Sequence, residues 1–227
     1  MSLSQYDVES GNQAYPYVDP FMTTADKAAP VEIIVFDFDG TITTDDTFRL
    51  FLRYYAGTLK WTANILLMLP IFIGYGLKIV DRNQAKIHVM RRFFKNAPVA
   101  RLNARAADFA KEIIPGLIRP QAQACLDNKK SDPESLYICS ASITPYLRAW
   151  GESQNIHNIL ATELESDGNH YTGEIKGWNI WGEGKMRRIL AEFAPQPVKI
   201  MEAYGDSRGD QEMLHAAEAS FFRPFRL

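Results

Sequence analysis

Two aspartates separated by one residue, Asp37 and Asp39, directly follow a short apolar run at residues 31–36. That run is rich in β-branched and aromatic residues and is too short for a helix, so it predicts a buried parallel strand. Open α/β sheets bind their ligands at the carboxyl ends of such strands. The spacing of the two aspartates directs both side chains to one face if the extended backbone continues. Carboxylates this close repel each other, which indicates a bound cation, a shared proton, or both.

The next two residues, Gly40 and Thr41, suit a site for an anion. Gly40 lets the chain turn tightly, and Thr41 offers a hydroxyl and a backbone N–H to a phosphate oxygen. Turns rich in Asp and Gly are also common where nothing binds. The segment therefore indicates metal-assisted phosphoryl transfer only if suitable partners follow downstream.

Suitable partners do follow, at the ends of other expected elements. Ser140 comes directly after a second apolar run at residues 136–139. Its hydroxyl and the N–H groups after it, including that of Ala141, can bind phosphate oxygens. Lys185 opens an expected helix and can neutralise charge on the same phosphate.

A second pair of carboxylates, Asp206 and Asp210, follows a third apolar run at residues 198–204. Hard carboxylate oxygens of this kind suit Mg²⁺. Each of these signals is weak by itself, because Ser often caps a helix and Asp is a common turn residue. Their occurrence in this order, mostly at strand ends, predicts one site for a metal ion and a phosphate.

The elements that must position these residues alternate between strand-like and helix-like patterns, which predicts a doubly wound α/β fold with a parallel sheet. A turn-rich stretch at 166–169 predicts a hairpin between the flanking segments. The segment between the first strand and the second is too long for a simple crossover, so we expect an inserted helical cap. The expected strands are 31–36, 136–139, 198–204 and 219–222, and the expected core helices are 117–130, 144–153, 185–193 and 211–217. The predicted division is a flexible N-terminal arm at 1–30, a catalytic core at 31–44 and 115–227, and a helical cap at 45–114.

One part of the expected cap, residues 61–80, is mostly apolar and has Lys78 as its only charge. Its length would permit a membrane-spanning helix. Pro70 and the glycines after it interrupt the run, which favours two short helices joined near residues 70–76. Their apolar faces could pack on the core or face lipid at a membrane surface. The helices expected after this run are rich in Lys and Arg, which indicates either a solvated face or a basic rim that attracts an anionic substrate or membrane.

The composition of the 227-residue chain is that of an ordinary globular protein, with 46% hydrophobic and 23% charged residues. A formal net charge of −2 gives no support for a nucleic-acid partner. The two cysteines, Cys125 and Cys139, are too few for a disulfide framework, and the first thirty residues lack the pattern of a signal peptide. These features predict a cytoplasmic protein, with peripheral membrane contact through the apolar part of the cap as the open alternative.

Taken in order, the four segments resemble the motifs of the haloacid dehalogenase superfamily of phosphatases. Asp37 to Thr43 looks like the first motif, Ser140 the second, Lys185 the third and residues 205–210 the fourth. The resemblance covers nearly all of residues 31–222. The position of the cap is similar to that in the phosphoserine-phosphatase-like branch with a helical cap (subfamily IB). A second relative in that branch is phosphatidylglycerophosphatase C, which has a comparably apolar cap.

The resemblance implies a phosphomonoester hydrolase with a two-step mechanism. Asp37 would attack phosphorus and form an aspartyl-phosphate, while Asp39 would protonate the leaving oxygen and then activate water. The implied Mg²⁺ ligands are Asp37, the backbone carbonyl of Asp39, Asp206 and Asp210. The implied phosphate-binding residues are Thr41, Ser140, Ala141 and Lys185.

Several other functions remain open or are excluded by particular residues. A cysteine phosphatase needs an Arg six positions after its Cys, but Cys139 has Pro145 there. No Walker-type loop is present. Phosphoserine phosphatases usually have Ser where this chain has Gly40, so an amphiphilic or lipid phosphomonoester competes with a small one as substrate. Phosphotransfer to an acceptor other than water, or a catalytically silent binding protein on the same fold, are the remaining alternatives.

Overall fold

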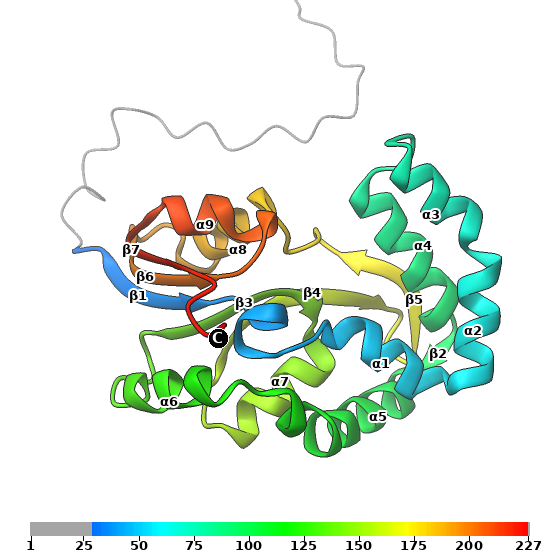
Figure 1. The fold of residues 1–227 in the computed structure, drawn as a ribbon, viewed down its shortest axis with the longest axis horizontal. Helices are drawn as coiled ribbons and strands as arrows, with labels where there is room; N and C mark the ends of the chain where they lie inside the picture. The colour runs from blue at the N-terminus through cyan, green and yellow to red at the C-terminus, as the bar shows by residue number, and fades with distance from the viewer. Residues whose placement is uncertain (1–28, 227) are drawn as a thin grey trace, which may run out of the picture.

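The computed structural model describes residues 29–226, and its centre is a seven-stranded sheet in the order β2-β5-β4-β3-β1-β6-β7 (Figure 1). Strands β4, β3, β1, β6 and β7 are parallel, whereas β5 is antiparallel to β4 and β2 is antiparallel to β5. The predicted α/β fold is confirmed, and so is the hairpin, which joins β4 and β5. The strands are β1 Val31–Phe36, β2 Ala97–Pro98, β3 Leu136–Ile143, β4 Asn158–Ser166, β5 His170–Lys176, β6 Val198–Gly205 and β7 Ala217–Phe222. The arm predicted at residues 1–30 lies outside the described residues except for 29 and 30.

Helices cover both faces of the sheet, with α8 and α9 on one face and α5, α6 and α7 on the other (Figure 1). Most expected helices are present, but α6 begins at Pro120 rather than at residue 117, because a short turn at Ile114–Leu117 precedes it. The helices are α1 Thr47–Ala56, α2 Thr58–Leu67, α3 Leu69–Gly76, α4 Arg82–Phe94, α5 Val99–Glu112, α6 Pro120–Lys129, α7 Thr144–Ser153, α8 Glu183–Phe193 and α9 Gln211–His215.

The apolar run of the expected cap forms two short helices, α2 and α3, as predicted, but their junction is not where the sequence placed it. The break lies at Met68 and not near residues 70–76. Pro70 lies in the first turn of α3, where a residue needs no N–H for the helical ladder, so it begins a helix instead of ending one. Among the described residues no single helix is both long and apolar enough to cross a membrane. Only α2 and α3 taken together reach that length, and they are bent by 54°.

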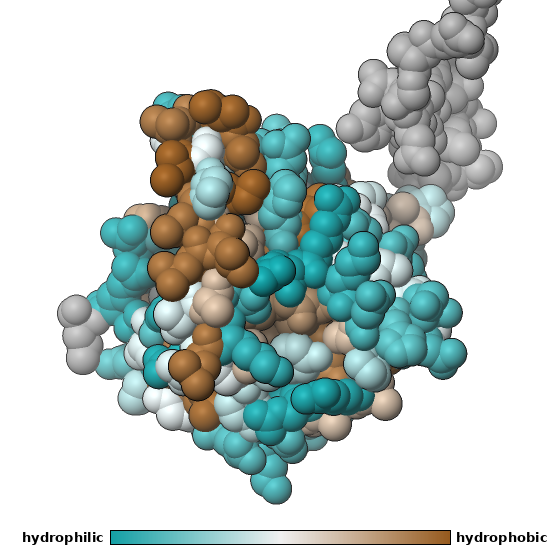
Figure 2. Space-filling model, turned by 90° about the vertical axis from the view of Figure 1, so that its right-hand side faces the viewer, coloured by the Kyte–Doolittle hydropathy of each residue, from teal (hydrophilic) through white to brown (hydrophobic). Residues whose placement is uncertain are grey.

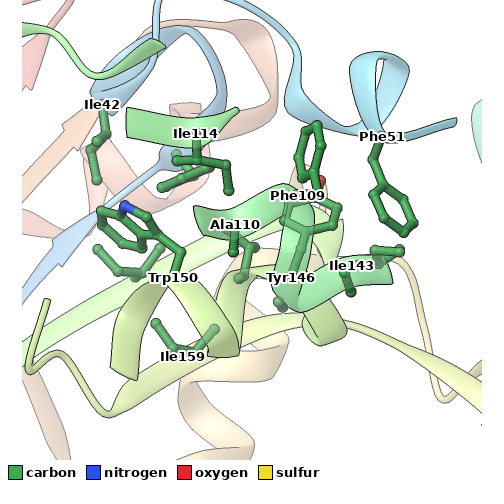
Figure 3. Packing of buried hydrophobic residues seen from close by; sticks show 14 of the residues in the cluster. Ile42, Phe51, Phe109, Ala110, Ile114, Ile143, Tyr146, Trp150 and Ile159 are labelled. Carbon is green, nitrogen blue, oxygen red and sulfur yellow. The ribbon is translucent and has the colours of Figure 1, made fainter. Parts of the chain in front are cut away.

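Two hydrophobic clusters hold the sheet between its helices, and β1 contributes to both because its side chains alternate between faces. Ile33 and Val35 point to the cluster under α8 and α9, whereas Phe36 points to the larger cluster on the other face. In the larger cluster, Phe51 of α1 and Phe109 of α5 pack around Tyr146 of α7, with ring centroids 5.2 and 5.3 Å from that of Tyr146 (Figure 3). These aromatic contacts join helices of the expected cap directly to a helix of the expected core.

Residues 45–114 hold helices α1 to α5, joined by turns, and the short strand β2, which forms one outer edge of the sheet. Ala97 pairs with Tyr171 and Pro98 with His170, so this part of the chain is hydrogen-bonded to the sheet. We retain the division into a core at 31–44 and 115–227 and a cap at 45–114 as a proposal. We call residues 45–114 the cap.

Candidate active site

The carboxyl ends of β1 and its two neighbours bring the predicted residues to one edge of the sheet. Asp37 follows β1 and Asp206 follows β6, and the last residue of β1, Phe36, pairs with Tyr204. The Asp37 backbone N–H donates to the Tyr204 carbonyl at 2.8 Å, which continues the sheet as far as the first carboxylate. On the other side of β1, Ser140 lies within β3. The parallel register alone therefore gathers side chains that lie up to 169 residues apart in the sequence, from Asp37 to Asp206 (206 − 37 = 169).

The chain after Asp37 makes one wide turn that depends on Gly40. The Thr43 N–H donates to the Phe38 carbonyl at 3.0 Å, and within the turn Gly40 has φ +77°. That conformation disfavours any residue with a side chain. A Cβ at this position would also lie 2.5 Å from Asp206 Oδ2. Glycine is thus needed both for the backbone and for the close approach of a second carboxylate.

Three buried carboxylates, those of Asp37, Asp206 and Asp210, converge at this edge. Each offers an oxygen, and these oxygens lie within 4.8 Å of one another. Three hard oxygens at this separation fit a divalent cation such as Mg²⁺. Asp39 is not a member of the group through its side chain. The sequence-based prediction gave Asp39 only a backbone carbonyl as ligand, and that part stays a prediction.

Two cations lie among these carboxylates. Lys185, almost wholly buried in the first turn of α8, places Nζ 2.5 Å from Asp37 Oδ1 and 2.6 Å from Asp210 Oδ1. Burial alone lowers the pKa of Lys185, but the two carboxylates outweigh it and raise the pKa above its usual value. Arg226, near the carboxyl end of the chain, donates to Asp206 Oδ2. Lys185 is therefore a permanent positive charge beside the carboxylate predicted to be the nucleophile.

Asp210 is fixed on both of its oxygens. Its Oδ2 accepts hydrogen bonds from the Asp206 N–H at 3.0 Å and from the Ser207 N–H at 2.9 Å, while Oδ1 meets Lys185. Burial acts to raise the pKa of Asp210, but Lys185 and these N–H donors hold it below the usual value. Asp210 stays ionised and shapes the loop after β6.

Asp37 is less firmly ionised. Its Oδ2 accepts a hydrogen bond from the Thr41 hydroxyl at 3.0 Å. Burial raises the pKa of Asp37 to about 7, although Lys185 acts in the opposite direction. A divalent cation bound at the carboxylate group would oppose the effect of burial and favour the ionised form.

Asp39 points away from the metal-binding group and toward the cap. Its Oδ1 accepts from the Thr47 N–H at 2.7 Å and from the Thr47 hydroxyl at 2.5 Å, and its Oδ2 accepts from the Ser142 hydroxyl. Burial, followed by the charge of Asp46, raises the pKa of Asp39 to about 6. A carboxyl group with such a pKa can donate and accept a proton near neutral pH. The two adjacent aspartates therefore have different environments and can have different roles.

The predicted phosphate-binding residues do not all reach the same space. A pocket of about 570 Å³ lies between the cap and the strand ends, and Lys185 and Ala141 are among its lining residues, whereas Thr41 and Ser140 are not. Ser140 is fully buried, and its hydroxyl accepts the Ser142 N–H at 3.0 Å. In this arrangement the Ser140 side chain supports the backbone of the loop after it.

Lys86 was not predicted to be a site residue, because in the sequence it is only one of several cations on a basic helix. Lys86 Nζ reaches across from α4 and donates to the Ala141 carbonyl, to Asn179 Oδ1 at 2.6 Å and to Thr162 Oγ1 at 3.2 Å. Burial, followed by the charge of Arg82, lowers the pKa of Lys86 to about 7. Helical periodicity gives no signal for this contact, because it depends on where α4 sits over the sheet. Thr47, eight residues after Asp39, was likewise not assigned.

The cap supplies a second, apolar wall to the pocket. Its side chains come from three helices of the cap, and they face the charged strand ends. These side chains are Phe48 of α1, Phe72 and Tyr75 of α3, and Ala85 and Val89 of α4. The pocket thus combines a charged floor, suited to a metal ion and a phosphate, with an apolar side suited to hydrocarbon.

Comparisons with known proteins agree with this geometry. The model of the haloacid dehalogenase-like hydrolase family matches residues 34–215. Protein CicA of Caulobacter vibrioides is 34% identical over 201 residues, which is 86% of each chain. Among solved structures, a protein of unknown function from Bordetella pertussis Tohama I has a TM-score of 0.70 at 19% identity, covering 83% of this chain and 87% of that one. A probable phosphoserine phosphatase from Vibrio cholerae has a TM-score of 0.58 at 16% identity, covering 85% of this chain and 57% of that one. At these identities the likeness to solved structures concerns the fold.

Proposed function

The chain belongs to the haloacid dehalogenase-like hydrolase family, and from this premise we propose that it is a Mg²⁺-dependent phosphomonoester hydrolase acting through an aspartyl-phosphate on Asp37. One observation carries the proposal. The buried Asp37 carboxylate lines an open pocket, with Lys185 on one oxygen and two further carboxylates within metal-binding distance. A nucleophile, a cation and a metal-binding group are what phosphoryl transfer requires.

The described residues fit a Mg²⁺ ion. Asp37, Asp206 and Asp210 would hold it, together with the backbone carbonyl of Asp39. Bound there, the ion would neutralise charge on the phosphoryl oxygens and reduce their repulsion of the nucleophile.

In the first step an Asp37 oxygen forms a bond to phosphorus while the bond from phosphorus to the leaving oxygen breaks. The protonated Asp39 gives its proton to that oxygen, and the alcohol departs. In the second step Asp39 takes a proton from water as the water oxygen bonds to phosphorus. The bond between phosphorus and Asp37 then breaks, which releases inorganic phosphate and restores both carboxyl groups.

Other groups position these reactants. Thr47 and Ser142 hold the Asp39 carboxyl on the side of the pocket that faces the cap, where a leaving group would lie. Lys185 and the backbone N–H groups after Ser140 would neutralise the phosphoryl oxygens. The Asp39 pKa of about 6 suits both halves of its task, because the group must change protonation state twice in each cycle.

The apolar wall of the pocket bears on the substrate. Phe48, Phe72 and Tyr75 face the strand ends, so the leaving group proposed is small or amphiphilic, with an apolar part that contacts these rings. We also propose that the chain lies in the branch with a helical cap (subfamily IB), because the cap lies between Asp37 and Ser140. Similarity to phosphatidylglycerophosphatase C is part of the same proposal. Phosphoserine is the second candidate substrate, since solved structures of phosphoserine phosphatases share this fold.

The test is Asp37→Asn, measured as phosphate release from an aryl phosphate in the presence of Mg²⁺. We expect a loss of about a thousandfold or more, because the amide cannot act as the nucleophile. The matched control is Asp127→Asn on α6, an exposed aspartate paired only with surface groups, which should keep full activity. Activity that survives Asp37→Asn, or that persists in excess chelator, would overturn the proposal.

A panel of phosphomonoesters then separates the candidate substrates. Phosphoserine, short aryl phosphates and phosphates with alkyl chains of increasing length are compared by kcat/KM. The apolar wall predicts that kcat/KM rises with chain length, whereas a preference for phosphoserine would favour the second candidate. Absence of turnover on every member, with Mg²⁺ present, would support a silent binding protein.

A further inference from the structure

The two short helices of the cap expose an unusual amount of apolar surface. We call residues 58–80, which hold α2, α3 and the turn after them, the apolar hairpin. No residue within either helix is buried. Figure 2 shows hydrophobic side chains gathered on a prominence above a mostly hydrophilic face. The large exposed side chains here are Leu59, Leu66, Leu67, Leu69, Ile73, Tyr75, Leu77 and Ile79. Contiguous patches of this kind mark interaction surfaces, whereas single exposed leucines do not.

The apolar hairpin has an inner side that is already occupied. Trp61 and Phe72 pack against the main hydrophobic cluster, and Met68, at the bend, is buried. Phe72 and Tyr75 also line the pocket. The inner side therefore holds the hairpin to the protein, and the outer side remains open to a partner.

Neither helix of the hairpin is long enough to cross a bilayer by itself. Helix α1 before it and helix α4 after it pack against each other, with the rings of Phe51 and Phe94 6.1 Å apart. Because Phe94 is the last residue of α4, the chain leaves α1 through α2 and α3 and returns to it along α4. Helices of 10 and 8 residues are each about 12–15 Å long at 1.5 Å per residue, and the roughly 30 Å of a hydrocarbon core is approached only by the two together, which are bent by 54°. The bend, together with the return of the chain along α4, favours insertion into one face of a bilayer over a straight span.

The charges within the apolar hairpin are of one sign, and the exposed carboxylate of Asp81 follows it directly. Residues 58–80 contain no Asp or Glu and two Lys, Lys60 near the first end and Lys78 near the second, both exposed. Arg92 of α4 donates to Asn64 at 2.8 Å and adds a third cation beside α2. Long lysine stems can lie along hydrocarbon while their ammonium groups reach phosphate. This arrangement matches an anionic lipid surface.

We propose that the apolar hairpin docks the protein on an anionic lipid surface, with Leu66, Leu67 and Ile73 among the acyl chains and the two lysines at the headgroups. A second copy of the chain is a poorer occupant, because pairing two hairpins would bring the lysines of both together, with only Asp81 at the end of each hairpin to offset them. Docking does not depend on catalysis. It would place the mouth of the pocket, which Phe72 and Tyr75 line, beside the lipid.

The experiment is co-sedimentation of the full chain with vesicles of phosphatidylcholine, with or without phosphatidylglycerol. We expect binding to the anionic vesicles, weaker binding to phosphatidylcholine alone, and a decrease as salt is added. The affinity of the double variant Leu66→Gln, Leu67→Gln for the vesicles should be about tenfold lower, or lower still, because the variant removes apolar area from the inserted face. Lys60→Gln with Lys78→Gln should weaken binding to the anionic vesicles only.

The matched control is Leu190→Gln on α8, since Leu190 is 55% exposed and Leu66 59% exposed, but Leu190 lies outside the hairpin. This variant should bind vesicles as the unchanged protein does. Circular dichroism and thermal unfolding verify that each variant is folded. Failure of the unchanged protein to bind either vesicle would overturn the proposal, as would equal losses in the hairpin and Leu190 variants. A dimer in sedimentation velocity that the Leu66, Leu67 variant abolishes would overturn it in favour of a second copy. None of these readouts depends on phosphatase activity, so docking and the proposed function can fail separately.

Discussion

The strand-end site and the apolar hairpin depart from an ordinary protein in opposite directions. At the strand ends, charged groups are buried: Lys185 and Asp210 are both about 1% exposed. In the hairpin, large apolar side chains face outward. Burying a charge is costly unless the charge is paired, and a contiguous patch of exposed apolar side chains is unusual for a free domain. Each is therefore evidence of a use other than holding the fold together.

The two regions differ in where their partners lie. At the strand ends the charges satisfy one another, because Lys185 bridges Asp37 and Asp210, and Asp39 has donors in Thr47 and Ser142. The outer side of the hairpin meets no comparable set of side chains within residues 29–226. A site complete in itself indicates chemistry on a small ligand, whereas an uncovered surface indicates a partner outside the chain.

The largest effect is expected for Lys185→Met. It removes a buried cation from two carboxylates, and breaking a buried pair in this way costs about 3–5 kcal/mol of unfolding free energy. Phosphatase activity should also fall, because the phosphoryl oxygens lose their fixed positive charge. The control is Lys129→Met, whose ion pair with Glu202 is partly exposed and should contribute no more than about 1 kcal/mol. Chemical denaturation measures the free energy of unfolding of each variant. Equal losses of unfolding free energy would show that burial does not distinguish the two ion pairs.

The next effect is expected for Gly40→Ala, compared with Gly57→Ala. Both glycines have φ +77°, so both variants should lose about 1–3 kcal/mol from backbone strain. A Cβ at Gly40 would meet Asp206, but nothing lies within 4 Å of one at Gly57. We therefore expect a loss of activity and of Mg²⁺ affinity in Gly40→Ala alone. Mg²⁺ titration followed by tryptophan fluorescence would check this, and a similar loss in Gly57→Ala would contradict it.

A smaller effect is expected for Ser142→Ala on the pH profile. The Ser142 hydroxyl bonds to the ionised form of Asp39 and lowers its pKa, so its removal raises that pKa above about 6. The first step needs Asp39 protonated, so kcat/KM falls as the pH rises through this pKa. In Ser142→Ala that fall should move to higher pH, by about one unit or less. Ser131→Ala on the surface is the control, and a shift to lower pH would exclude Asp39 as the acid.

The smallest effect belongs to the hairpin. Leu66→Ala should change unfolding free energy by no more than about 0.5 kcal/mol and leave activity on a soluble aryl phosphate unchanged. The same substitution at the fully buried Leu102 should cost about 2–5 kcal/mol. Denaturation in vesicle-free buffer measures both. A loss at Leu66 as large as that at Leu102 would mean that its outer side is covered by the protein itself.

The sequence predicted the site wherever position follows from strand order. Asp37 and Asp206 meet because parallel neighbours end at the same edge, and that much can be inferred from apolar runs followed by carboxylates. Lys185 follows from its place at the start of a helix. Whether Ser140 reaches the pocket through its side chain could not be predicted, because burial depends on the register of β3 and not on residue type.

The contributions of the cap could not be predicted in the same way. Thr47 and Lys86 reach the site because α1 and α4 lie over the sheet at particular angles, which side-chain packing decides. The junction of α2 and α3 was placed wrongly because Pro70 was interpreted as a break and not as a first-turn residue. Periodicity and composition did predict that the segment forms two short helices and not one long one.

The short strand β2 has a mechanical consequence. The chain between α4 and α5 is hydrogen-bonded to β5 and the turn before it. The Asn96 N–H donates to the Tyr171 carbonyl and the Val99 N–H donates to the Asn169 carbonyl, both at 2.8 Å. If the cap moved away from the core as one rigid body, these hydrogen bonds would have to break in every catalytic cycle. A movement that keeps these hydrogen bonds would have to occur elsewhere at the pocket, for example at α3. Access to the pocket would then depend on a local movement of α3 and not on a movement of the whole cap. Helix α3 belongs to the apolar hairpin, the segment that we expect to contact lipid.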